Sequence, residues 1–119
     1  MAFNLDMKKE YRVRKNEEFA RIISEKRSVA NGSFVVYYSD RKKEHARVGI
    51  SVSKKLGDAV DRNRIKRQVR EMIYALISFE QYSKDLIIIV RKGYLGKAFS
   101  ENKNDLEKAI KKAIIEKYE

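Results

Sequence analysis

The chain has 119 residues, and 28 Lys and Arg against 17 Asp and Glu give it a formal net charge of +11. A hydrophobic content of 43% is enough to bury one modest core, and the absence of cysteine excludes disulfides and thiolate metal sites. Without an apolar run of membrane-spanning length or a signal peptide, the protein is expected to be cytoplasmic and to have no membrane partner. We expect a mobile N-terminal arm over residues 1–8 and a single domain over residues 9–119.

A first helix is predicted from Asn16, whose side chain can act as its N-cap. Glu17 and Glu18 suit the positive end of the helix dipole. One apolar face follows at helical spacing and consists of Phe19, Ile22 and Ile23. We expect the helix to end between residues 27 and 31.

Two strands are predicted next, over Ser33–Ser39 and Arg47–Ser53, because their residues alternate between two faces. The faces of the first strand consist of Phe34, Val36 and Tyr38 and of Val35 and Tyr37. The faces of the second consist of Val48, Ile50 and Val52 and of Gly49, Ser51 and Ser53. The short charged turn between the strands predicts that they pair as a hairpin.

The second of these strands has one nearly bare face, formed by Gly49, Ser51 and Ser53. A bare face allows another backbone to approach closely, and Tyr37 and Phe19 could supply aromatic walls beside it. Single-stranded nucleic acid is held in such clefts by stacking. Each aromatic residue taken alone is, however, more often part of a core.

A strongly basic helix is predicted from about Ala59. Gly57 ends the preceding strand, and Asp58 with Asp61 resembles a capping box. Its apolar stripe has helical spacing and consists of Ile65, Val69, Met72, Ile73 and Leu76. Its cations lie beside that stripe, with Arg62, Lys66 and Arg70 in one row, Asn63 and Arg67 next to them, and Arg64 further round.

Residues 54–70, which contain this helix start, carry seven Lys or Arg against two Asp. A solvated surface face is the ordinary explanation for such a charge run. Three features point instead to a polyanion: arginine outnumbers lysine within the helix, Asn63 can bond phosphate or ribose, and few carboxylates stand four residues away to neutralise the row. The segment therefore predicts a nucleic-acid contact.

The C-terminal third adds a strand and a helix. Leu86–Val90 is an unbroken apolar run, typical of a central strand covered on both faces. Ser100 is expected to cap a helix whose buried stripe consists of Leu106, Ile110, Ala113 and Ile114. The order helix, strand, strand, helix, strand, helix predicts an α+β fold, a small α/β sandwich. If the second and third strands are parallel neighbours, the basic helix is their crossover.

No catalytic constellation is visible in the sequence. The single histidine, His45, stands among charged residues, and Asp58 and Asp61 are explained by helix capping. No carboxylate or histidine cluster has the spacing of a metal nuclease, and there is no phosphate-binding glycine loop. We expect no catalytic residue, no metal and no cofactor on the protein itself.

Taken together, these segments resemble the protein subunit of bacterial ribonuclease P, the ribonucleoprotein that removes 5′ leaders from precursor tRNA. The resemblance covers about residues 8–115. It rests on residues 48–57 (VGISVSKKLG), on Ala59-Val60 and on residues 62–67 (RNRIKR) with Arg70. Residues 16–19 (NEEF) and 85–91 (DLIIIVR) support it. It implies a left-handed β-α-β crossover, against the general preference for right-handed connections.

The resemblance also implies partners and sites. In this family the RNA subunit performs the hydrolysis with Mg²⁺, while the protein binds that RNA and the single-stranded leader of precursor tRNA. The RNA-subunit site would consist of Lys54, Lys55, Arg62, Asn63, Arg64, Lys66, Arg67 and Arg70. The leader cleft would consist of Arg12, Phe19, Ile23, Val35, Tyr37, Ser51 and Arg91. We expect the free protein to be a monomer.

Two other functions are compatible with a basic helix. A small ribosomal protein would share the helix but need not have a bare strand beside an aromatic cleft. A self-sufficient nuclease should cut RNA without any added RNA subunit.

Overall fold

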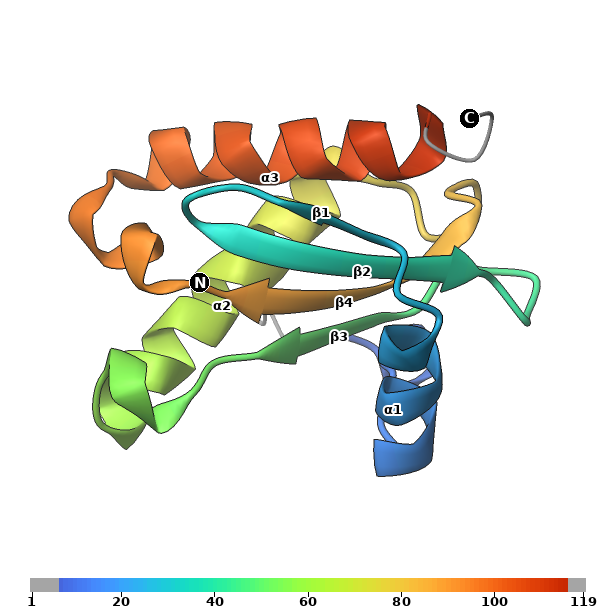
Figure 1. Cartoon of the computed structure of the whole chain (residues 1–119), viewed down its shortest axis with the longest axis horizontal. Coiled ribbons are helices and arrows are strands. Elements are labelled where there is room, and N and C mark those ends of the chain that lie inside the picture. Colours follow the sequence, from blue (N-terminus) through green and yellow to red (C-terminus); the bar gives the residue numbers. More distant parts are fainter. Residues whose placement is uncertain (1–6, 116–119) are drawn as a thin grey trace, which may run out of the picture.

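A computed structural model describes residues 7–115, which form an α+β sandwich around one four-stranded sheet, as predicted (Figure 1). The strands are β1 (Ser28–Ala30), β2 (Phe34–Asp40), β3 (Val48–Ser51) and β4 (Lys84–Val90). The α-helices are α1 (Asn16–Ser24), α2 (Ala59–Leu76) and α3 (Phe99–Ile115). Short 3₁₀ turns are η1 (Lys9–Tyr11), η2 (Lys54–Leu56) and η3 (Lys92–Gly96).

The helices cover the two faces of the sheet unequally. The main core joins one face of the sheet to α2 and α3, and its fully buried members include Phe34, Val36, Ile65, Val69, Met72, Ile73, Leu86, Ile88 and Leu106. The predicted stripes of α2 and α3 are therefore confirmed, with Leu76 and Ile114 packed at the margin of the core. On the other face α1 stands alone over a small cluster of Val13, Ile22 and Ile87.

The strand order is β1-β2-β4-β3, so the predicted hairpin between β2 and β3 is wrong. β4 lies between these strands, antiparallel to β2 and parallel to β3. The reason is burial: β4 is apolar on both faces, and the centre of the sheet is where both faces can be covered. β3 and β4 are parallel neighbours, a pairing that the sequence left open, and α2 connects them. The short edge strand β1, which pairs with β2, was not predicted.

Two predicted caps are also wrong. Asn16 is the first residue inside α1; the capping position is Lys15, which makes no side-chain cap. α1 ends earlier than predicted, and the chain turns at Lys26, whose φ of 58° is left-handed, before entering β1. In α3, Ser100 lies inside the helix, and the Glu101 carboxylate accepts the Ala98 N–H at 3.0 Å. The Glu101 carboxylate thus binds the backbone N–H of the residue that precedes the helix, which differs from the cap predicted for the Ser100 hydroxyl.

Met7 and Lys8, the first described residues, are already in contact with the rest of the domain. Met7 is 2% exposed and belongs to the main core, and the Lys8 N–H donates to the Tyr74 hydroxyl. Arg12 then forms a parallel bridge with Val48 at the edge of β3. The arm predicted over residues 1–8 falls mainly on residues 1–6, which lie outside the described residues.

A buried ionic network ties α1 to the sheet. The Asp85 carboxylate is fully buried, and it accepts the Arg47 backbone N–H at 2.9 Å and the Arg47 guanidinium at 3.4 Å. The other side of that guanidinium donates to Glu18 of α1 at 2.6 Å. This hydrogen bond lowers the pKa of Glu18. Because the pKa is depressed in the folded state, the stability from this pair is present above the ordinary carboxyl pKa and is lost as the pH falls through the depressed value.

We expect Asp85→Ala to lower the free energy of unfolding by about 3–5 kcal/mol, because it leaves Arg47 buried with only one carboxylate. Asp85→Asn retains an acceptor for the Arg47 backbone N–H and should cost less. Urea unfolding of both variants measures the two losses. Equal and small losses in the two variants would show that the Asp85 carboxylate contributes little to the stability of this network.

Candidate nucleic-acid interface

The start of α2 is fixed by the local sequence. Gly57 has a φ of 143°, and a Cβ there would lie 2.7 Å from the Asp61 side chain. The predicted capping box is present: the Asp58 carboxylate accepts the Asp61 N–H at 2.9 Å, and the Asp61 carboxylate accepts the Asp58 N–H at 3.3 Å. The hydrogen bond from the Asp61 N–H lowers the pKa of Asp58. The glycine and the two carboxylates therefore set the direction in which the basic helix leaves the sheet.

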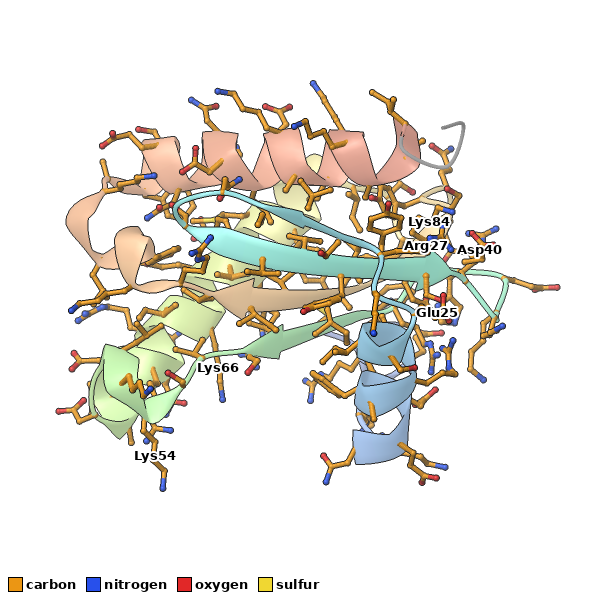
Figure 2. The ribbon with its side chains drawn as sticks, in the orientation of Figure 1. Glu25, Arg27, Asp40, Lys54, Lys66 and Lys84 are labelled. Carbon is orange, nitrogen blue, oxygen red and sulfur yellow. The ribbon has the colours of Figure 1, made fainter. Side chains whose placement is uncertain are left out.

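The predicted RNA-subunit residues lie together around this helix start, and they form what we call the α2 surface. Half-buried cations form one row down α2, at Arg62, Lys66 and Arg70. The exposed members of the α2 surface are Lys54, Lys55, Asn63, Arg64 and Arg67. Figure 2 shows Lys54 and Lys66 projecting from the side of the sheet on which α1 stands.

Within residues 7–115, most cations of the α2 surface lack a carboxylate partner. Arg64 pairs with Asp61 at 3.4 Å, which the sequence interpretation did not anticipate. A larger group makes no ion pair within 4.0 Å among residues 7–115: Lys54, Lys55, Arg62, Lys66 and Arg67. The Nε of Arg62 is buried without a hydrogen-bond partner in that part of the chain.

The opposite end of the sheet shows what neutralised cations look like in this protein. Lys84 and Arg27 both reach Asp40, and Arg27 also lies 3.8 Å from Glu25 (Figure 2). Both of these cations meet a carboxylate of the same chain. Because the α2 surface has so few such partners, its repulsion is left for an external polyanion to relieve.

The α1 face of the sheet consists of two rows that run across the strands. The row of Gly49, Ile87 and Tyr37 lies under α1, where Ile87 is fully buried. The next row, Ser51, Ile89 and Val35, is exposed or half-buried. α1 thus covers only part of this face. We call the uncovered row of Ser51, Ile89 and Val35 the shelf.

Phe19 changes the role expected for Gly49. A Cβ built on Gly49 would lie 2.5 Å from the Phe19 ring and 2.9 Å from the Ile87 side chain. Gly49 therefore admits a ring of the same protein, and the expectation that a foreign backbone approaches there is wrong. The open part of the bare strand begins at Ser51, which is exposed. Phe19 itself is half-buried, with its ring between the shelf and the N-terminal segment.

A pocket of about 130 Å³ joins Phe19 to the basic helix. It is lined by Phe19 and Gly49 together with the cations Arg12, Lys66 and Arg70. The Nε–H of Arg12 donates to the Met7 carbonyl at 2.7 Å, which holds its guanidinium at this pocket. The sequence interpretation treated the helix and the cleft as separate surfaces. The structure makes them neighbours through Lys66 and Arg70.

The remaining predicted cleft residues frame the shelf. Ile23 and Tyr37 pack against the small α1 cluster and keep partly exposed sides. Arg91 lies beyond the end of β4, where its guanidinium donates to the Asn31 carbonyl at 2.8 Å. Ile89 belongs to the shelf but was not among the predicted cleft residues. Strict alternation within β4 would have placed it beside Ile87 and Arg91 on the α1 face.

Neither His45 nor any acidic group forms a reactive cluster in the part of the chain that the structure describes. His45 packs edge-on to the Tyr11 ring, with 5.2 Å between the ring centroids. No group of three or more His, Cys, Asp or Glu residues within 7–115 is arranged to hold a metal ion. No helix in this range is long and apolar enough to cross a membrane.

Comparisons with known proteins agree with this geometry. The model of the family named Ribonuclease P matches residues 7–114. The chain belongs to the ribonuclease P protein family. A ribonuclease P protein component from Streptococcus pyogenes is 42% identical over 93% of each chain. This assigns the chain to the protein subunit of ribonuclease P and not to the ribosomal alternative.

Solved ribonuclease P proteins share the fold. A Staphylococcus aureus ribonuclease P protein, a mutant described as defective in mRNA degradation activity, matches with a TM-score of 0.79 and 44% identity. The match covers 88% of this chain and 89% of the Staphylococcus aureus chain. The Thermotoga maritima protein matches with a TM-score of 0.73 and 30% identity, covering 85% of this chain and 96% of its own.

Proposed function

We propose that the α2 surface binds the catalytic RNA subunit of ribonuclease P, while the shelf beside α1 binds the 5′ leader of precursor tRNA. The observation that carries this proposal is the arrangement of the α2 surface, where Arg62, Lys66 and Arg67 make no ion pair within residues 7–115, directly beside a half-covered sheet face with aromatic walls. Cations without carboxylate partners favour phosphate contacts, and a half-exposed Phe19 and Tyr37 favour stacking of single-stranded bases.

The two surfaces divide the work of binding. The α2 surface offers guanidinium forks and ammonium groups to a phosphate chain, which neutralises their mutual repulsion. Stacking on aromatic rings does not distinguish one base from another, so the shelf would accept leaders of different sequence. Lys66 and Arg70, which border the Phe19 pocket, would meet the leader where it approaches the RNA subunit.

In this proposal the RNA subunit holds the Mg²⁺ and performs the phosphodiester hydrolysis. The protein strengthens that step by screening phosphate repulsion between the RNA subunit and the substrate. In this proposal the protein is located in the cytoplasm and is a monomer when it is not bound to the RNA subunit.

A reconstitution assay tests these roles. Precursor tRNA is incubated with the protein alone, with the catalytic RNA alone, and with both, at low and at high Mg²⁺. We expect 5′ leader removal to require the RNA and, at low Mg²⁺, also the protein. Cleavage by the protein alone would overturn the division of labour. The same assay with an mRNA substrate measures whether the protein degrades mRNA, the activity named for the Staphylococcus aureus relative.

A further inference from the structure

A further concavity is lined mostly by residues outside both surfaces discussed above. It has a volume of about 570 Å³ and surrounds the first turn of α1. We call it the α1 basin. Its cations are Lys9, Arg12, Arg14, Lys15, Lys43 and Arg47, and its carboxylates are Glu10 and Glu18.

The basin is assembled by the fold from two distant parts of the chain. Residues 9–15 precede α1, and residues 43–47 lead into β3. The bridge between Arg12 and Val48 holds the two segments side by side. Charge that looks evenly spread along the sequence is therefore gathered in space, and the α2 surface is not the only concentration of cations.

Most of this charge is free to meet a ligand. Lys9, Arg14, Lys15 and Lys43 are exposed, and none makes an ion pair within 4.0 Å inside residues 7–115. Of the two carboxylates, Glu18 is occupied by Arg47 at 2.6 Å. The basin therefore has a clear excess of positive charge.

Arg47 adds a second observation that points to a ligand. It is 5% exposed, it lines the basin, and its Nε is buried without a hydrogen-bond partner within the described chain. α1 also begins here without a side-chain cap on its first turn. The positive helix end adds to the attraction for an anion, although the carboxylates of Glu17 and Glu18 in the first turn oppose it.

The chemistry of the lining favours a phosphodiester backbone over an acidic peptide. Every described lining residue is charged or polar, and none of them is an aliphatic residue against which a peptide side chain could anchor. Protein interfaces gain most of their affinity from a few anchors, often Trp, Tyr or Arg, that fill well-packed pockets. Binding of an RNA backbone needs none, because cations arranged along the phosphates provide the affinity.

Arg12 links the basin to the proposed leader site. It lines both the basin and the Phe19 pocket, so the two concavities meet at this side chain. We propose that the α1 basin binds the phosphates of the distal part of a long leader, after the proximal part has crossed the shelf. This inference rests on the proposed leader site and extends it.

The test uses the holoenzyme and precursor tRNAs whose leaders have one, about five or about twelve nucleotides, within the site sizes common for single strands. The basin variant replaces Lys9, Arg14, Lys15 and Lys43 by Ala. The matched control replaces Lys103, Lys108, Lys111 and Lys112 of α3 by Ala, which removes the same charge from the other face of the sheet. Circular dichroism establishes that both variants are folded.

We expect the basin variant to bind the RNA subunit and the two shorter substrates like the control. For the longest leader it should bind more weakly, and its salt dependence should flatten by about 0.7 log unit for each phosphate that the basin no longer neutralises. Unchanged binding of the longest leader would overturn the inference, and the basin would then be left to a partner other than RNA, such as an acidic peptide. Equally weakened binding of all leaders, or weaker binding of the RNA subunit, would also overturn it.

The same measurements separate this inference from the proposed function. If the parent holoenzyme gains affinity between one and about five nucleotides but not beyond, only the basin inference fails. If it gains nothing between these two lengths, the proposed leader site on the shelf fails, and the basin inference falls with it.

Discussion

Replacing Arg62, Arg64, Lys66 and Arg67 by Ala should produce the largest decrease in affinity for the RNA subunit. The salt dependence of binding should flatten by about 0.9 log unit for each duplex phosphate that the variant no longer neutralises. If three phosphates are affected, the fall in affinity between 50 and 200 mM salt should become roughly 40-fold smaller. Binding titrations of the catalytic RNA over this salt range measure the slope.

The four α2 positions are not equivalent. Arg64 is held at 3.4 Å by Asp61, so Arg64→Ala alone should change the slope less than Arg67→Ala, whose cation is exposed and has no ion-pair partner within 7–115. The α3 control variant, which removes the same total charge, should retain the parent slope. If the α3 and α2 variants showed the same slope, the effect would come from net charge alone and the α2 assignment would be withdrawn.

Local features of α2 could be predicted from the sequence because their causes are local. The Asp58 and Asp61 carboxylates cap a helix that begins within a few residues of them, and the spacing of Ile65, Val69 and Met72 sets the buried side. Once cap and buried side are fixed, the cations must point elsewhere. The helical residues of the α2 surface follow from this argument without any knowledge of the sheet, whereas Lys54 and Lys55 precede the helix.

Long-range features could not be predicted in the same way. Strand order depends on which strand is covered on both faces, and a short turn between β2 and β3 led to the wrong pairing because β4 enters between them. The fit of the Phe19 ring over Gly49 depends on how far α1 stands from β3. The α1 basin depends on the bridge between Arg12 and Val48, which joins segments more than thirty residues apart.

The two parts of the sheet face illustrate the limit most clearly. Strand patterns identified Tyr37 and Ser51 as candidates for one cleft, and the family resemblance added Val35, but neither decided which positions α1 covers. Register decides it: Tyr37 lies across from Ile87 under the helix, while Val35 and Ser51 flank Ile89 in the open row. Packing of one short helix therefore determines how much of the strand face remains for a ligand.

The rings of Phe19 and Tyr37 can be removed with little change in the α2 surface. We expect Phe19→Leu with Tyr37→Leu to weaken binding of precursor tRNA with a leader of several nucleotides by about 1–3 kcal/mol for each base that stacks. Leucine is chosen because Phe19 packs on Gly49 and Ile87, and an alanine there would open a cavity as well as remove the ring. Equilibrium binding to the holoenzyme measures the decrease in affinity.

Two controls make the result specific to the shelf. Binding of the catalytic RNA should be nearly unchanged, since every cation of the α2 surface remains in place. Substrate with a single-nucleotide leader, which does not reach Phe19, should be weakened much less than substrate with the longer leader. Tyr37→Phe keeps the ring and should bind like the parent if stacking, and not the hydroxyl, is what the leader uses. Equal weakening for both leader lengths in a folded variant would mean that the leader lies elsewhere, because only a leader that reaches the shelf can be deprived of a stacking partner there.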